Sequence, residues 1–81
     1  MTRDEFIAWA NRQGWTQDRF GHFHNPTGNY RIKIQAKSIR LERSYYSEVD
    51  HCKKYVRLRG AYFGQLSLSA DDKLVGLKKE W

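Results

Sequence analysis

Hydrophobic and polar residues alternate strictly from Tyr30 onwards, in the stretch YRIKIQAK. Because strand side chains point to opposite faces with a period of two, this pattern predicts a half-buried strand with one basic face. The apolar set resumes at Ile39 and Leu41, out of phase with Ile34. One interpretation is a hairpin that turns at Lys37-Ser38 and places Ile34 opposite Leu41. The other is a continuous strand with a bulge, since Lys-Ser is uncommon in two-residue turns.

A short amphipathic helix is predicted over residues 3–13. Thr2 and Glu5 have the spacing of a capping box, in which each side chain bonds the backbone of the other residue. Gly14 follows where a helix end favours a residue with positive φ. The apolar residues of the helix form one stripe, which we expect to pack on the apolar face of the sheet: Phe6, Trp9 and Ala10.

Two further segments have the pattern of strands. Residues 18–24 should form a strand joined to Tyr30 by the turn Asn25–Asn29, which is rich in turn-forming residues. Residues 55–59 alternate again after a polar loop over residues 47–54. Val56 and Leu58 should point inward there, and Tyr55, Arg57 and Arg59 should point outward.

Together these elements predict an α+β fold in a single domain, residues 1–81. An N-terminal helix packs on a small, mainly antiparallel sheet of four or five strands. The tail from residue 69 is compatible with a C-terminal helix and with a hairpin, because SADDK could begin a helix or form a loop.

Composition narrows the choice of partners. The chain has 15 Lys and Arg against 9 Asp and Glu, a net charge of +6, which favours nucleic acid or an acidic protein surface. Cys52 is the only cysteine, so no intrachain disulfide is expected. No apolar run reaches the roughly 18–20 residues of a membrane span, and the N-terminus does not resemble a signal peptide. We therefore expect a cytoplasmic protein of bacterial or phage type that does not bind membranes.

A basic and aromatic sheet face is the main candidate site. Lys and Arg neutralise phosphates and aromatic rings stack on unpaired bases, so we expect nucleic-acid binding, of RNA more than of DNA. A solvated sheet face has a similar composition, and Glu42 within the patch favours that simpler interpretation. The candidate residues are Arg31, Lys33, Arg40, Tyr55, Arg57 and Arg59.

A protein interface is the second interpretation. Adjacent aromatic residues on a strand cannot all point inward, and exposed tyrosine is common in interfaces. A phage- or plasmid-type inhibitor or adaptor would use such a surface: Tyr45, Tyr46, Tyr62 and Phe63.

A ribonuclease is the third interpretation. His22 with Arg19 could combine acid–base chemistry with phosphate stabilisation. The motif spacing typical of zinc sites is absent, and we expect no metal, no cofactor and a binding protein rather than an enzyme.

Residues 5–34 resemble the opening of HicA-type toxins. The shared pattern is a helix, Gly14-Trp15, Arg19, Gly21-His22 and a strand after a turn that contains proline. The resemblance implies a fold like that of double-stranded-RNA-binding domains, mRNA cleavage and a catalytic role for His22. The small residue that the family has between the glycine and the histidine is missing here, and residues 38–81 do not follow the family pattern.

Overall fold

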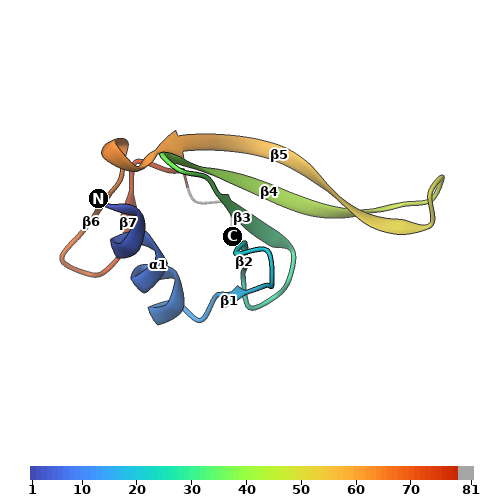
Figure 1. Ribbon diagram of the computed structural model, residues 1–81. Coiled ribbons are helices and arrows are strands. Elements are labelled where there is room, and N and C mark those ends of the chain that lie inside the picture. Colours follow the sequence, from blue (N-terminus) through green and yellow to red (C-terminus); the bar gives the residue numbers. More distant parts are fainter. Residues whose placement is uncertain (79–81) are drawn as a thin grey trace.

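The computed structural model describes residues 1–78 and has an α+β architecture (Figure 1). A helix precedes a five-stranded antiparallel sheet in the order β1-β2-β3-β4-β5, and a short 3₁₀ helix then leads to a two-stranded hairpin. The elements are α1 (Arg3–Arg12), β1 (Thr16–Gln17), β2 (Phe23–His24), β3 (Tyr30–Ile34), β4 (Ser38–Ser47), β5 (Cys52–Tyr62), η1 (Phe63–Gln65), β6 (Ser67–Leu68) and β7 (Leu74–Val75). The tail to residue 78 is thus a hairpin without a helix, and the rest of the tail lies outside the described residues.

Both predicted ends of α1 are confirmed. The Thr2 side chain accepts a hydrogen bond from the Glu5 N–H, and the Glu5 carboxylate accepts one from the Thr2 N–H. At the other end Gly14 has φ +82°, and the N–H of Trp15 donates to the carbonyl of Ala10 at 3.0 Å. These contacts satisfy backbone groups that a helix end would otherwise leave unpaired.

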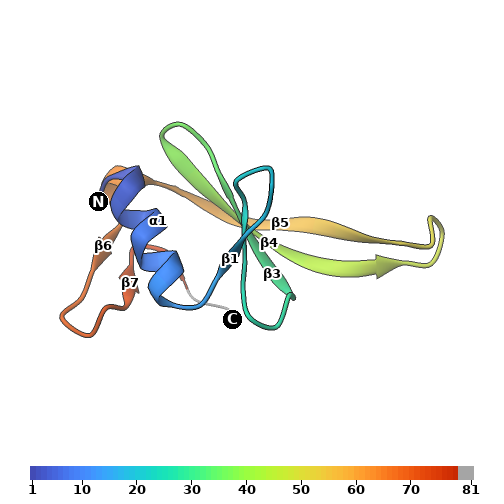
Figure 2. The ribbon, with the colours of Figure 1, turned by 60° about the horizontal axis from the view of Figure 1, so that its bottom comes forward.

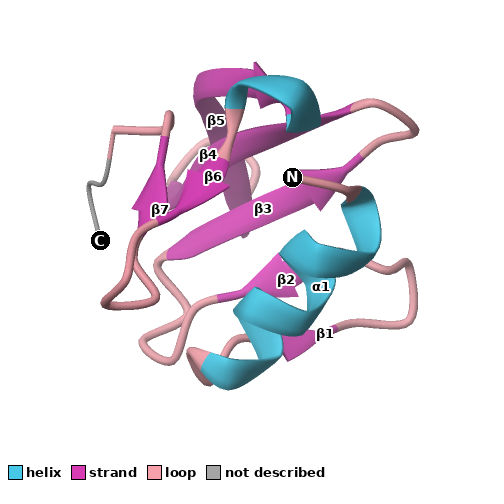
Figure 3. Ribbon diagram, turned by 90° about the vertical axis from the view of Figure 1, so that its left-hand side faces the viewer, coloured by secondary structure: helices cyan, strands magenta, loops and turns pink. Residues whose placement is uncertain are grey.

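The core lies between α1 and one face of the sheet (Figure 3). Phe23, Ile32 and Leu41 stand opposite one another on three neighbouring strands, and all three are fully buried. Phe6 and Trp9 of α1 belong to the same core cluster, as the apolar stripe predicts.

The hairpin between β3 and β4 is confirmed, but its predicted register is wrong. Ile34 faces Ile39 rather than Leu41, and the two-residue turn falls one position earlier, between Gln35 and Ser38. The Gln35 N–H donates to the Ser38 carbonyl at 2.9 Å. This register pairs the apolar residues of both strands with one another on the core side.

The predicted strand over residues 18–24 is wrong for most of its length. A tight turn occupies positions 18–22, because the Asp18 carboxylate accepts hydrogen bonds from the N–H groups of Phe20 and His22 at 2.8 and 3.0 Å. Gly21 provides the positive φ, +85°, that such a turn requires. Only β2 remains as a strand, and the Asn25–Asn29 turn joins it to β3 as predicted.

The β4–β5 hairpin extends far beyond the rest of the sheet (Figures 1 and 2). Pairing with β3 ends at Arg43, whereas β4 and β5 stay paired as far as Ser47 and Cys52. The polar loop predicted over residues 47–54 is therefore wrong, since only a short turn joins the strands. We call residues 45–54 the hairpin arm. The arm makes the molecule elongated, with dimensions of 43 × 23 × 21 Å.

The register of this hairpin shifts between Leu41 and Glu42. Arg59 faces Leu41 and Arg57 faces Glu42, so Leu58 is an extra residue on β5. We call this irregularity the Leu58 bulge.

The β6–β7 hairpin is attached to α1 through Asp72. The Asp72 carbonyl accepts a hydrogen bond from Trp9 Nε1 at 2.8 Å, and the Asp72 carboxylate accepts two from Arg12 at 2.7 and 3.0 Å. Asp72 has φ +60°. Within residues 1–78, no helix is long and apolar enough to cross a membrane.

Candidate nucleic-acid interface

The sheet face opposite α1, here called the open face, carries most of the charged strand residues. The registers place His24, Arg31, Glu42 and Arg57 in one row across four strands. Lys33, Arg40 and Gly60 form the next row, and Ser38 with Tyr62 the third. Directly opposed residues share a face, so these side chains belong to one surface.

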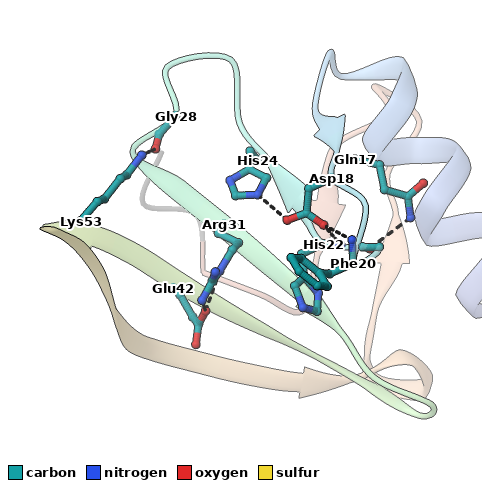
Figure 4. A network of polar contacts seen from close by, with 10 residues as sticks. Gln17, Asp18, Phe20, His22, His24, Gly28, Arg31, Glu42 and Lys53 are labelled. Atoms are coloured by element: carbon teal, nitrogen blue, oxygen red, sulfur yellow. Dashed lines mark hydrogen bonds and ion pairs between the residues drawn. The ribbon is translucent and has the colours of Figure 1, made fainter.

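Arg31 is already bound within the protein (Figure 4). Its Nε and Nη2 both donate to Glu42 Oε1, at 2.9 and 2.5 Å, and Glu42 is only 6% exposed. The guanidinium carbon lies 3.5 Å from the centre of the Tyr55 ring. Arg31 and Tyr55 therefore contact each other, and neither is fully available to a ligand.

The other predicted cations of the open face are differently placed. Among the described residues, Lys33, Arg40 and Arg57 form no ion pair. Lys33 lies directly opposite Arg40 in the ladder. Like charges in this position repel each other. No acid of residues 1–78 pairs with these cations, so the described part of this surface is positive.

Arg59 does not belong to the open face, contrary to prediction. The Leu58 bulge moves it into line with Leu41, whose side chain lies in the core, and its Nε atom is buried. A bulge cannot be seen in the alternation of one strand, because it depends on how two distant segments pair.

A small hollow lies on the open face above Gly60, with a volume of about 260 Å³. Arg40, Arg57 and Tyr62 are among its lining residues. A Cβ atom on Gly60 would lie 3.0 Å from the carbonyl oxygen of Ile39 and 3.4 Å from Nη2 of Arg57. The glycine therefore keeps this space open. A glycine inside a strand is the sequence signal that could have indicated it.

A second polar group surrounds Asp18 (Figure 4). His24 Nε2 lies 2.8 Å from Asp18 Oδ2, and the ring of Tyr55 packs edge-on to His24 with centroids 6.3 Å apart. Burial by itself would raise the pKa of Asp18. Hydrogen bonds from His24 and from the N–H groups of His22 and Phe20 outweigh burial and lower that pKa to about 2. The carboxylate is thus ionised and orients His24, a role that sequence analysis missed.

The two residues of the predicted ribonuclease pair, His22 and Arg19, contact different groups. His22 is half-buried, and burial lowers its pKa, helped by the charges of Lys33 and Arg31 and opposed by that of Asp18. Arg19 lies in the exposed turn with its guanidinium 4.9 Å from the Phe20 ring centre. Within the described chain, no hydrogen bond joins His22 to Arg19.

The four aromatic residues of the protein-interface interpretation do not form one surface. Tyr45 and Tyr46 are exposed on the hairpin arm, 46% and 63% respectively. Tyr62 is also 63% exposed but lies at the opposite end of β5, and Phe63 belongs to the core. Tyr45 and Tyr46 are the adjacent pair in which both rings are exposed, and as consecutive strand residues they point to opposite faces.

Among residues 1–78, no three His, Cys, Asp or Glu side chains gather in a way that could hold a metal ion. Comparisons of the chain with protein-family models, curated proteins and solved structures find no match.

Proposed function

We propose that the protein is a cytoplasmic nucleic-acid-binding module that uses the open face, and that it binds RNA in preference to DNA. The observation that carries the proposal is the cluster of Lys33, Arg40 and Arg57, cations without ion-pair partners among residues 1–78. Glu42 cannot neutralise them fully, because Arg31 engages its carboxylate. A phosphate backbone would supply the missing counter-charge.

The preference for RNA rests on aromatic exposure. Proteins recognise RNA chiefly through unpaired bases, which stack on aromatic side chains. Tyr62 offers such a ring beside the cations of the open face.

Salt-dependent binding tests this proposal. Fluorescence anisotropy with labelled RNA and DNA should show affinity falling steeply as salt rises. The double variant Arg40→Gln/Arg57→Gln should reduce the slope of log affinity against log salt by about two. The control Arg3→Gln/Lys73→Gln removes the same charge from α1 and the β6–β7 loop, and should change the slope less. If the wild-type protein binds neither RNA nor DNA at low salt, the proposal is wrong.

A protein-binding inhibitor or adaptor is a second candidate, and the exposed hairpin arm favours it. Tyr45, Tyr46 and Val49 are exposed there, and Lys53 and Lys54 add positive charge that suits an acidic partner surface. Purification from a bacterial host should then recover one stoichiometric partner that Tyr45→Ala/Tyr46→Ala loses and Tyr62→Ala retains. Equal recovery by all three proteins would contradict a role for the arm.

A HicA-like ribonuclease is a third candidate. Support comes from His22, because the burial that lowers its pKa favours the neutral imidazole that a general base needs. RNA cleavage or growth arrest that persists unchanged in His22→Ala would exclude this role.

A further inference from the structure

The Gly60 hollow brings two cations together. Arg40 and Arg57 reach it from adjacent strands, and neither has an ion-pair partner among the described residues. Among the described residues that line the hollow, none carries a carboxylate. Each guanidinium group presents several N–H donors in its own plane, a geometry that matches phosphate oxygens.

Two amide side chains, those of Gln35 and Gln65, are also among the lining residues. Gln35 Oε1 accepts a hydrogen bond from Ser38 Oγ at 2.8 Å, and Gln65 Oε1 accepts one from the Tyr62 N–H at 3.1 Å. Because each oxygen is bound within the protein, the Nε2 groups of both glutamines are oriented to donate elsewhere. The hollow therefore fits a ligand that accepts hydrogen bonds and carries negative charge.

The dimensions limit how much of a ligand can enter. A volume of about 260 Å³ is smaller than the roughly 300–1,000 Å³ of pockets for drug-sized molecules. A phosphate with part of its sugar suits this space, while a larger planar group would remain outside.

Tyr62 is placed to receive that planar group. It lines the hollow, yet its side chain is largely exposed. Tyr55 differs from it, because the guanidinium of Arg31 covers the Tyr55 ring. An exposed ring beside a phosphate site is suited to stacking with an unpaired base, whereas both faces of a base inside a duplex are already stacked.

We propose that the Gly60 hollow is a subsite for one nucleotide of a single strand. Arg40 and Arg57 hold the phosphate, Gln35 and Gln65 donate to its oxygens or to the sugar, and the base stacks on Tyr62. This subsite rests on the proposed function of the open face and adds to it a single-stranded substrate.

A comparison of two equally exposed tyrosines tests the subsite. Tyr46 and Tyr62 are each 63% exposed, and both lie on the open-face side of the β4–β5 hairpin. Anisotropy with labelled oligouridylate should show Tyr62→Ala weakening affinity by roughly 5- to 150-fold, the effect of losing one stacked base. Tyr46→Ala should leave affinity unchanged, and Tyr62→Phe should retain most of it because the ring remains. Since Tyr62 is exposed, circular dichroism should show the same fold for all variants.

Measurements with duplex RNA and with free ligands complete the test. Wild-type protein should bind oligouridylate more tightly than duplex RNA at equal salt, and uridine monophosphate should compete better than inorganic phosphate. If Tyr62→Ala binds like Tyr46→Ala, or if inorganic phosphate competes equally well, the subsite is wrong while binding by the open face stands. If the wild-type protein binds no nucleic acid, both proposals are wrong.

Discussion

The guanidinium carbon of Arg31 lies 3.5 Å above the Tyr55 ring, while the same side chain donates two hydrogen bonds to Glu42. This arrangement gives the centre of the open face a structural role. It also separates the cations of that face into Arg31, which is paired with Glu42, and the Lys33–Arg40–Arg57 cluster, which has no ion-pair partner among residues 1–78.

Loss of Arg31 should therefore reduce stability. Arg31→Gln would leave the buried Glu42 carboxylate without its partner, and we expect the free energy of unfolding to fall by about 3 kcal/mol. The exposed Arg57→Gln is the matched control and should change it by less than about 0.5 kcal/mol. Urea-induced unfolding measures both. Equal midpoints for the two variants would show that the ion pair does not stabilise the fold.

Asp18 should make stability depend on pH in the acidic range. Its pKa is about 2 in the folded protein against an ordinary value of 3.8, so the unfolded chain binds the proton more readily. The stabilisation is complete above about pH 4 and is lost as the pH falls towards 2. Thermal unfolding midpoints between these values should fall more steeply for the wild type than for Asp18→Asn. Parallel curves would contradict the assignment.

His22 should make stability depend on pH in a higher range than Asp18 does. Burial lowers its pKa below the ordinary value of 6.5, so the unfolded chain again binds the proton more readily. Stability should decline as the pH falls from above 6.5 towards the lowered pKa, and His22→Gln should remove that decline. His51→Gln, a change in the exposed turn of the arm, is the control. The measurement compares the unfolding midpoints of the wild type, His22→Gln and His51→Gln at pH 7.5 and at pH 5.5.

Asp72 should matter more than its neighbour Asp71. Asp72→Ala removes the carboxylate that binds Arg12 and places alanine at a positive φ, so we expect a lower melting temperature. Asp71→Ala should have little effect, because its side chain is exposed. Differential scanning calorimetry of the two variants makes the comparison, and equal melting temperatures would mean that the Asp72 contacts contribute nothing.

The hairpin arm should be removable. Replacement of residues 45–54 by Asn-Gly would join Ser44 to Tyr55, which are paired across the strands, through a turn suited to a two-residue hairpin. The core cluster contains no residue of the arm, so we expect a folded protein with a melting temperature close to that of the wild type. A nucleic-acid-binding open face would remain active in this variant, whereas a partner that uses the arm would be lost.

Local signals in the sequence predicted local structure well. The caps of α1 and the alternation in β3 involve residues that contact near neighbours in the chain, and both are confirmed. Alternation also placed Lys33, Arg40 and Arg57 on one face, as the structure has them. Nucleic-acid binding by that face stays a prediction.

Features that depend on pairing between distant segments were not predictable in the same way. The position of Arg59 depends on the Leu58 bulge, and the bulge arises only where β5 meets β4. The Asp18 turn was missed for another reason, because alternation at Phe20, His22 and His24 concealed a side chain that bonds its own backbone.

The Leu58 bulge has a consequence for the shape that a partner meets. A bulge bends its strand and increases the local twist, and this one lies on β5 opposite the part of β4 that still pairs with β3. Deletion of Leu58 would keep every opposed pair on its present face but would point the arm in a different direction. A ligand that touches only the arm would tolerate the shortened chain, while one that contacts both sides of the bulge, as at Arg57 and Arg40, would find its two contact regions misaligned.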